Sequence, residues 1–162
     1  MIGVAALMIT SKILSGQEAD ACRKIVEDLL TNHQMSLLSY EVVPDKRELI
    51  VQRLQALCEK GDVPMILTLG GTGVRPTDWV PEATREVIEK EIPGIAEAMR
   101  AESLKKVRTA MLSRGIAGIK GHTVIINLPG SAKGIKENCE VIFPLLEHLV
   151  QKMGHAESKG DS

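Results

Sequence analysis

Short, uninterrupted apolar runs, each followed by a helical pattern, constrain the fold of this 162-residue chain more than any other feature. The runs over residues 3–10 and 64–69 are apolar almost throughout, which is typical of strands buried on both faces. Strands of this kind that alternate with helices predict a mostly parallel sheet with helices on both faces. We therefore expect a single three-layer α/β domain over residues 1–153, followed by a disordered polar tail over 154–162.

The remaining elements are expected to continue this alternation. Further strands are expected over residues 37–43, 115–120 and 122–128, and helices over 18–33, up to Gly61, from Pro81 to Pro93, over 95–106 and over 135–149. Asp45 is expected to be the N-cap of the helix that ends at Gly61, with Glu48 completing a capping box. Asp78 is expected to cap the helix that Pro81 opens.

Charge and aromatic content exclude two classes of partner. Twenty Lys and Arg residues against 21 Asp and Glu residues give a formal net charge of −1, which provides no general field for gripping nucleic acid or an anionic membrane. Tyr40, Trp79 and Phe143 are the only aromatic residues, too few for a base-stacking platform. No apolar run approaches the roughly 20 residues that cross a bilayer, and the sequence predicts a cytoplasmic protein.

Cysteine and histidine positions give no sign of a disulfide framework or a zinc site. Cys22, Cys58 and Cys139 are widely spaced and fall on apolar helical positions, so we expect plain buried thiols. The four histidines are scattered without i, i+4 partners, which argues against a histidine metal site.

The predicted functional edge of the sheet lies at the carboxyl ends of the strands, where ligands bind in open parallel sheets. Of the loops expected there, Gly70–Gly73 combines three glycines with Thr72 directly after a buried strand. Successive N–H groups in such a loop can converge on an anion, although a tight turn would also use these glycines. The loop contains neither a P-loop lysine nor the dinucleotide fingerprint.

Two aspartates follow neighbouring strand ends. Asp45 follows the strand that ends at Val43, and Asp78 follows the glycine loop. Two carboxylates beside a bound phosphate would repel it unless a hard cation lay between them, so both are predicted Mg²⁺ ligands and catalytic residues.

A second candidate anion site is predicted where the strand ending at Leu128 leads into the last helix. Pro129, Gly130 and Ser131 form that junction, and Ser131 is the expected N-cap, so N–H groups and the helix dipole favour an anion. Lys133 adds a positive charge in the first turn, where a phosphate partner would compensate its unfavourable position. Ser113 and Arg114 precede a glycine and are further candidate phosphate contacts.

An ordered set of motifs resembles one known family. The motifs are Leu-Gly-Gly-Thr-Gly at 69–73, Asp78 with Pro-Glu-Ala-Thr at 81–84, Glu-Ala-Met at 97–99 with Glu-Ser-Leu-Lys at 102–105, Met-Leu-Ser-Arg-Gly at 111–115, and Ile-Asn-Leu-Pro-Gly-Ser at 126–131. In order and spacing they resemble the molybdopterin-binding proteins of molybdenum cofactor biosynthesis, the MogA/MoaB type, which includes the G domain of gephyrin. The resemblance runs from about Tyr40 to His148.

This resemblance implies a specific reaction. Enzymes of the family transfer AMP from ATP to the terminal phosphate of molybdopterin with Mg²⁺, and they are usually trimeric. By resemblance, Asp45 and Asp78 match the two functional aspartates, and the pocket that holds pterin and nucleotide is matched by Gly70, Gly71, Thr72, Gly73, Ser113, Asn127, Pro129 and Ser131. The expected partners are molybdopterin, ATP, two further copies of the chain and the molybdenum-insertion protein of the pathway.

Several positions depart from the family pattern. The chain has Thr10-Ser11-Lys12 where Ser-Asp commonly follows the first strand, and Asp20-Ala-Cys22-Arg23 where the family has Asp-x-Ser-Gly. Leu69 and Trp79-Val80 replace commoner residues around the glycine loop. The departures leave open an alternative, a molybdopterin-binding carrier or scaffold that does not adenylylate. If Arg23 covers the nucleotide side of the crevice, ATP is expected to bind less tightly than pterin.

Overall fold

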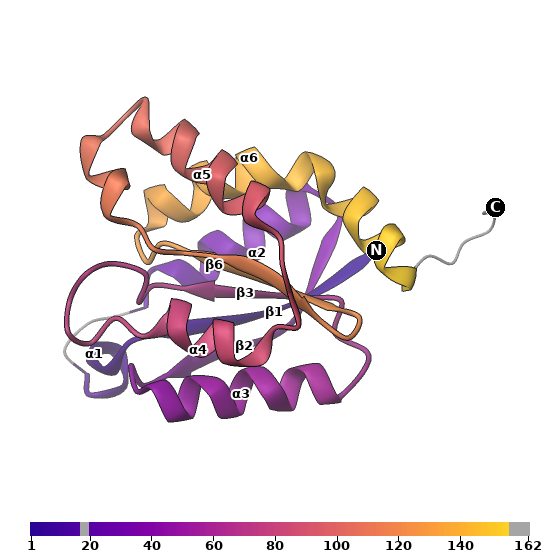
Figure 1. Cartoon of the computed structure of the whole chain (residues 1–162), viewed down its shortest axis with the longest axis horizontal. Coiled ribbons are helices and arrows are strands. Elements are labelled where there is room, and N and C mark those ends of the chain that lie inside the picture. The colour runs from indigo at the N-terminus through magenta and orange to yellow at the C-terminus, as the bar shows by residue number, and fades with distance from the viewer. Residues whose placement is uncertain (17–19, 156–162) are drawn as a thin grey trace.

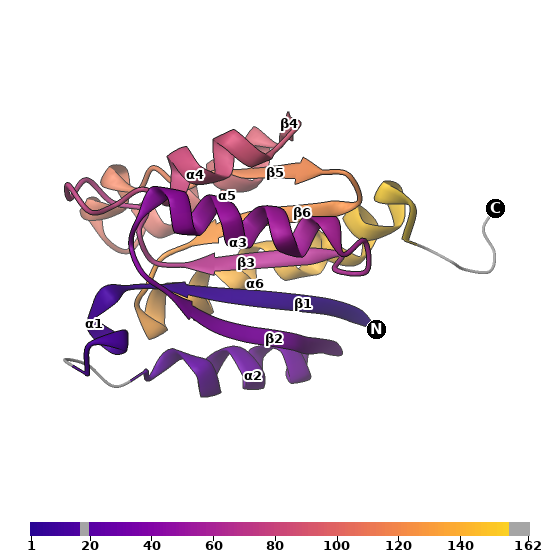
Figure 2. The ribbon, with the colours of Figure 1, turned by 90° about the horizontal axis from the view of Figure 1, so that it is seen from below.

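The computed structural model describes residues 1–16 and 20–155. These residues form one six-stranded sheet with helices on both faces, in the strand order β2-β1-β3-β6-β5-β4 (Figures 1 and 2). The expected three-layer α/β architecture is confirmed. Residues 156–162 of the predicted tail lie outside the described range.

Four parallel strands make the centre and one side of the sheet. They are β1 (Ile2–Ile9), β2 (Met35–Val43), β3 (Met65–Leu69) and β6 (Thr123–Leu128). Pairings such as Ile9 with Val43 and Leu69 with Leu128 bring their carboxyl ends to the same edge. The antiparallel strands β5 (Ala117–Lys120) and β4 (Lys90–Glu91) complete the sheet on the other side.

Helices divide the apolar residues into two cores, one on each face of the sheet. The helices α2 (Cys22–Asn32), α5 (Pro93–Leu104) and α6 (Ala132–Val150) pack on one face. The opposite face carries α3 (Arg47–Glu59) and α4 (Val80–Val87). Side chains of β1, β3 and β6 alternate between the two cores, which is why these three strands read as continuous apolar runs.

Some predicted boundaries were wrong. The second strand begins at Met35 and the last helix begins at Ala132, each earlier than expected. The helix opened by Pro81 ends at Val87, well before Pro93, and β4 follows it. Pro93 instead begins α5, because proline at the first helical position loses no hydrogen bond. The short helix α1 (Ser11–Leu14) was not predicted, and part of the helix expected from residue 18 lies outside the described residues.

The cysteine prediction is confirmed for two residues of three. Cys22 and Cys139 are buried, whereas Cys58 is half-buried at the end of α3. No helix in the described ranges is long and apolar enough to cross a membrane.

Candidate functional site

The loops after β1, β2, β3 and β6 meet at the carboxyl edge of the parallel strands (Figure 2). Two of these loops touch backbone to backbone. The N–H of Gly70 donates to the carbonyl of Leu128 at 2.9 Å, and a Cβ on Gly130 would lie 3.1 Å from the Cα of Gly70. Gly70 and Gly71 have φ of +93° and +70°, a conformation that favours glycine. Close approach of two backbones therefore requires glycine at this crossing.

One cavity of about 520 Å³, here the carboxylate pocket, opens at this crossing. Both predicted aspartates line it, together with the whole glycine loop and the turn before α6: Asp45, Asp78, Gly70, Gly71, Thr72, Gly73, Pro129, Gly130 and Ser131. Lys12 and Arg75 line it as well, so two cationic side chains face two anionic ones. Residues far apart in the chain thus share one pocket, as the strand order predicts.

Asp78 is held in place by the loop around it rather than by a helix. Its Oδ2 accepts a hydrogen bond from the N–H of Arg75 at 2.9 Å and lies where a Cβ on Gly73 would come within 2.9 Å. The side chain is only 6% exposed. The predicted capping role is wrong, because Trp79 occupies the N-cap of α4 and no side chain caps it. Asp78 Oδ1 has no protein partner among the described residues.

Asp45 is held by Ser11, the first residue of α1. Its Oδ1 accepts a hydrogen bond from the hydroxyl of Ser11 at 2.5 Å, and its N–H lies 3.4 Å from the same hydroxyl oxygen. The predicted capping box is wrong, since Lys46 is the N-cap of α3 and caps through no side chain. Asp45 Oδ2 has no partner in residues 1–16 and 20–155. Each aspartate therefore commits one oxygen to the fold and leaves the other uncommitted.

This donor set fits Mg²⁺ better than a metal held by protein alone. Within the described part of the chain, no group of three or more His, Cys, Asp or Glu side chains is arranged to hold a metal ion. Mg²⁺ is commonly bound through one or two carboxylates, with substrate phosphates and water completing its coordination. Two fixed carboxylates in one pocket with a glycine loop match that pattern.

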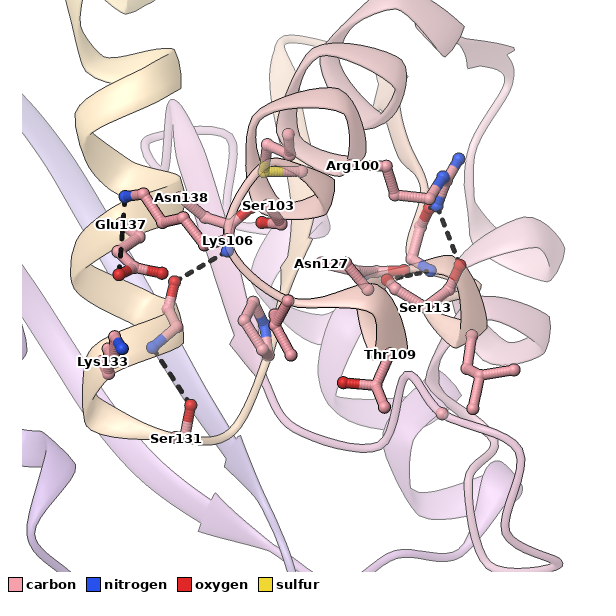
Figure 3. A pocket seen from close by; sticks show the side chains of 18 of the residues that line it. Arg100, Ser103, Lys106, Thr109, Ser113, Asn127, Ser131, Lys133, Glu137 and Asn138 are labelled. Atoms are coloured by element: carbon pink, nitrogen blue, oxygen red, sulfur yellow. Dashed lines mark hydrogen bonds and ion pairs between the residues drawn. The ribbon is translucent and has the colours of Figure 1, made fainter.

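A second cavity of about 460 Å³, here the helix pocket, adjoins the first (Figure 3). Gly73, Pro129 and Ser131 line both pockets, so the two cavities lie next to each other. The walls of the helix pocket are the first turns of α6 on one side and, on the other, α5 with the 3₁₀ helix η1 (Arg108–Leu112). The charged side chains that line it are Arg100, Lys106, Lys133 and Glu137, an excess of positive charge.

The first turn of α6 supplies anion-binding features to both pockets. Ser131 is its N-cap, as predicted, and its hydroxyl accepts a hydrogen bond from the N–H of Gly134 at 3.0 Å. Lys133 lies on the helix pocket wall one turn from Glu137 (Figure 3). Lys106 bridges to Glu137 at 3.5 Å across the gap between α5 and α6. A helix N-terminus with an adjacent lysine favours a phosphate at this point.

Asn127 lies beneath the helix pocket and joins four elements. Its amide nitrogen donates to the hydroxyls of Thr68 and Thr84 at 3.0 Å each, and its Oδ1 accepts from the N–H of Ile116 at 3.1 Å. The residue is 2% exposed. Asn127 lines the pocket, as predicted, while its polar atoms tie β6 to β3, α4 and the segment that enters β5.

Arg114 turns away from the ligand space. Its guanidinium donates to the carbonyl of Gly73 at 2.7 Å and to that of Asp78 at 2.9 Å, and it pairs with Glu82. Its N–H also donates to the carbonyl of Thr72 at 2.8 Å. Instead of the predicted phosphate contact, Arg114 holds the glycine loop and the backbone of Asp78 in position. Ser113, its neighbour, lines the helix pocket, where Arg100 donates to its carbonyl at 3.2 Å.

Some residues of the site were not among the predicted site residues. Ser11, which holds Asp45, and Lys12, which lines the carboxylate pocket, were considered only as departures from the family pattern. Both follow β1, a central parallel strand whose carboxyl end reaches the same edge as the other loops, so the strand-end rule also assigns them to the site. Arg100 and Lys106 line the helix pocket from α5 and the turn after it. In the sequence, both residues are equally typical of a solvent-exposed helix face. Only the packing of α5 beside α6 shows that they line a pocket.

The altered residues near α2 affect the pocket indirectly. Arg23 lies 5.3 Å from the centre of the Tyr40 ring and pairs with Glu27, and it is absent from the lining of the carboxylate pocket. Arg23 therefore does not cover the carboxylate pocket. Cys22 reaches the site instead, since its thiol donates to the carbonyl of Gly130 at 3.5 Å. Burial, and then the nearby charge of Asp20, raise the pKa of the Cys22 thiol and keep it a donor.

Comparison with known proteins agrees with this geometry. A family model described as "Probable molybdopterin binding domain" matches residues 5–148. The chain belongs to this molybdopterin-binding family. The molybdopterin adenylyltransferase of Helicobacter pylori is 38% identical over 151 residues, covering 92% of this chain and 86% of that protein. The molybdopterin adenylyltransferase of Escherichia coli is 36% identical over 139 residues, covering 85% and 71%.

Solved structures of this molybdopterin-binding family share the whole fold. The molybdopterin biosynthesis enzyme MoaB of Thermus thermophilus superimposes with a TM-score of 0.91 at 38% identity, covering 98% of this chain and 100% of that one. The molybdopterin biosynthesis Mog protein of Mycobacterium ulcerans gives a TM-score of 0.88 at 35% identity, covering 95% and 100%. Insertions or missing elements therefore do not separate this chain from these relatives.

Proposed function

We propose that this chain is a molybdopterin adenylyltransferase that transfers AMP from ATP to the terminal phosphate of molybdopterin. The observation that carries the proposal is the adjacency of two cavities, in which a pocket with two fixed carboxylates adjoins a more cationic pocket across Pro129 and Ser131. Both cavities have the volume of small-molecule sites. The full-length relatives named molybdopterin adenylyltransferase support the same reaction.

The proposed arrangement puts ATP in the carboxylate pocket and the pterin in the helix pocket. Asp45 and Asp78 would hold Mg²⁺ through their uncommitted oxygens, and the ion would neutralise charge on the phosphates. The glycine loop offers backbone N–H groups to the nucleotide phosphates. The N-terminus of α6 and Lys133 bind and orient the terminal phosphate of molybdopterin.

In this arrangement, the transfer depends mainly on positioning. The terminal phosphate oxygen of molybdopterin attacks the α-phosphorus of ATP, a new P–O–P bond forms, and the bond to pyrophosphate breaks. Attack by an anion on an anion requires that charge be neutralised and the two phosphates be held in line. Of the three residues that line both pockets, Ser131 is the one with a side-chain hydroxyl, and we assign it to orienting both phosphates.

A second candidate function is a carrier that binds molybdopterin without adenylylating it. Ser11 favours this candidate, because a hydroxyl stands beside Asp45 where relatives commonly have a further acidic residue. A neutral group there leaves two carboxylates rather than three to attract the cation, which would weaken nucleotide binding more than pterin binding.

One assay distinguishes the two functions. The chain is incubated with molybdopterin, ATP and Mg²⁺, and pyrophosphate release is followed together with the formation of adenylylated molybdopterin. We expect one pyrophosphate to be released for each adenylylated molybdopterin that forms. Pterin binding without pyrophosphate release in excess ATP and Mg²⁺ would support the carrier and contradict the enzyme.

We also propose a cytoplasmic homotrimer that delivers its product to a molybdenum-insertion protein. The family resemblance supports the trimer, and the exposed apolar side chains of Leu104 at the end of α5 and Met111 in η1, which line neither pocket, provide surface that an assembly could cover. Light scattering at micromolar concentration is expected to give about three times the chain mass of 17.6 kDa. A monomer mass would contradict the trimer.

A further inference from the structure

Arg75 occupies a fixed position beside Asp78 in the loop that joins β3 to α4. Its N–H donates to Asp78 Oδ2 at 2.9 Å, and the N–H of Asp78 donates back to the carbonyl of Arg75 at 2.9 Å. This reciprocal pair closes a turn, so the backbone of Arg75 cannot move far from the carboxylate. The side chain lies outside this turn and is 73% exposed.

The guanidinium of Arg75 makes only a loose ion pair with Asp78. Its Nε lies 3.6 Å from Asp78 Oδ2, beyond the usual range of a hydrogen bond. An exposed arginine gains little from such a pair and exchanges it easily. The Arg75 side chain also lines the carboxylate pocket, together with the glycine loop and Asp45. A mobile guanidinium is thus tethered within reach of any phosphate chain that enters.

We propose that Arg75 is a ligand for the phosphate chain of the nucleotide, and that its guanidinium competes with a divalent cation for Asp78. This inference rests on the proposed function, because it takes ATP and Mg²⁺ as the ligands of the carboxylate pocket. A cation at Asp78 repels the guanidinium, while the phosphates that enter with it offer the guanidinium a bidentate partner. Binding of the nucleotide therefore moves Arg75 from carboxylate to phosphate.

This exchange predicts effects of opposite sign when the Arg75 side chain is removed. The cation alone should bind Asp78 more tightly, because its competitor is gone. The nucleotide should bind less tightly, because its phosphate chain loses a charged partner. A residue that only stabilised the loop would weaken both, and a merely solvated arginine would change neither.

Arg75→Ala tests the exchange, because the turn is closed by the backbone N–H of residue 75, which alanine retains. Calorimetric titration measures Mn²⁺ alone, as a probe of the cation site, and then ATP in saturating Mg²⁺. The matched control is Arg85→Ala, which removes a similarly exposed arginine whose ion pair with Glu91 lies outside both pockets.

For Arg75→Ala we expect Mn²⁺ to bind about two- to fivefold more tightly and ATP at least about tenfold less tightly. Both affinities should stay within about twofold in Arg85→Ala. Any other combination for Arg75→Ala, including a loss of both affinities or no change in either, overturns the exchange. If the unaltered chain binds no ATP in Mg²⁺, the proposed function fails and this inference fails with it.

Discussion

The carboxylate pocket and the helix pocket share Gly73, Pro129 and Ser131 but differ in how their charge is held. In the first, Asp45 and Asp78 are fixed by hydrogen bonds to a hydroxyl and a backbone N–H, and their charge is concentrated at two points. In the second, Arg100, Lys106 and Lys133 are spread along the walls of α5, the turn after it and α6. A metal requires anionic ligands at fixed points, whereas a phosphate can be held by several cations spread along a wall, so the pockets suit different ligands.

The difference between the pockets is tested most strongly by Asp78→Asn. Asparagine keeps an oxygen that can accept the N–H of Arg75, so the loop should remain folded while the negative charge is lost. We expect pyrophosphate release to fall about a hundredfold or more, because metal positioning contributes several kcal/mol to such reactions. Molybdopterin affinity should stay within about tenfold.

The control for Asp78→Asn is the melting temperature, which should stay close to that of the unaltered chain. Unchanged pyrophosphate release would remove Asp78 from the mechanism. A large loss of melting temperature would instead show that the charge of Asp78 is needed for folding.

Arg114 is expected to support the carboxylate pocket without contacting a ligand, so its removal should impair the pocket indirectly. Arg114→Ala breaks the bonds to the carbonyls of Gly73 and Asp78, so the glycine loop loses its support. We expect the free energy of unfolding to fall by about 2 kcal/mol, since a charged hydrogen-bond donor is lost. Pyrophosphate release should fall about tenfold at saturating substrates, with the KM for molybdopterin within about threefold.

Urea unfolding and steady-state kinetics on the same preparation of Arg114→Ala give both readouts. A rise in the KM for molybdopterin at unchanged kcat would mean that Arg114 contacts the pterin phosphate, as the sequence analysis expected.

Lys133→Ala tests the helix pocket, and it should affect molybdopterin binding rather than ATP binding. Loss of this cation at the N-terminus of α6 should weaken molybdopterin binding about tenfold, because one charged contact to phosphate is removed. ATP affinity should change by less than about threefold, since Lys133 lies outside the carboxylate pocket. Fluorescence titration with molybdopterin and calorimetry with ATP measure the two.

Lys136→Ala is the matched control, because Lys136 lies on the same helix outside both pockets. It should leave molybdopterin affinity unchanged. If Lys133→Ala and Lys136→Ala weakened molybdopterin binding equally, the effect would come from the overall charge of α6 and not from a contact made by Lys133.

The smallest effect is expected from the pH dependence of the Glu82–Arg114 pair. Burial acts to raise the pKa of Glu82. The hydrogen bond from Arg114, a backbone hydrogen bond and the charges of Arg114 and Arg47 together outweigh burial and hold the pKa below its ordinary value of 4.5. A depressed carboxyl pKa adds stability that is present above 4.5 and is lost as the pH falls through the folded-state pKa.

Glu82 is partly exposed, so its contribution should be below about 1 kcal/mol. We expect urea unfolding at about pH 6 and about pH 3.5 to show a smaller pH difference for Glu82→Gln than for the unaltered chain. An equal pH difference in both proteins would show that the pair contributes nothing to acid sensitivity.

The sequence determined the sheet and the position of its functional edge. Continuous apolar runs such as Val4–Ile9 can be satisfied only by burial on both faces, and this requirement predicts parallel strands between two helical layers. The glycine loop, Asp45, Asp78 and Ser131 follow from the same rule, since each lies in a segment that follows the carboxyl end of a parallel strand. Local patterns are sufficient to place these residues, because a strand that is recognised in the sequence also fixes where the loop after it begins.

Only the tertiary structure decided which partner each polar side chain takes. Asp45 and Asp78 have sequences around them that favour helix capping, yet Ser11 and the N–H of Arg75 bind their oxygens instead. Arg114 reads as a phosphate ligand and binds two carbonyls from a loop 36 to 41 residues away. Such choices depend on which groups the packing of the sheet and helices brings within about 3 Å, and a hydrogen bond is decided at that distance. A linear pattern records residue types and spacings along one element, and it carries no information on that distance.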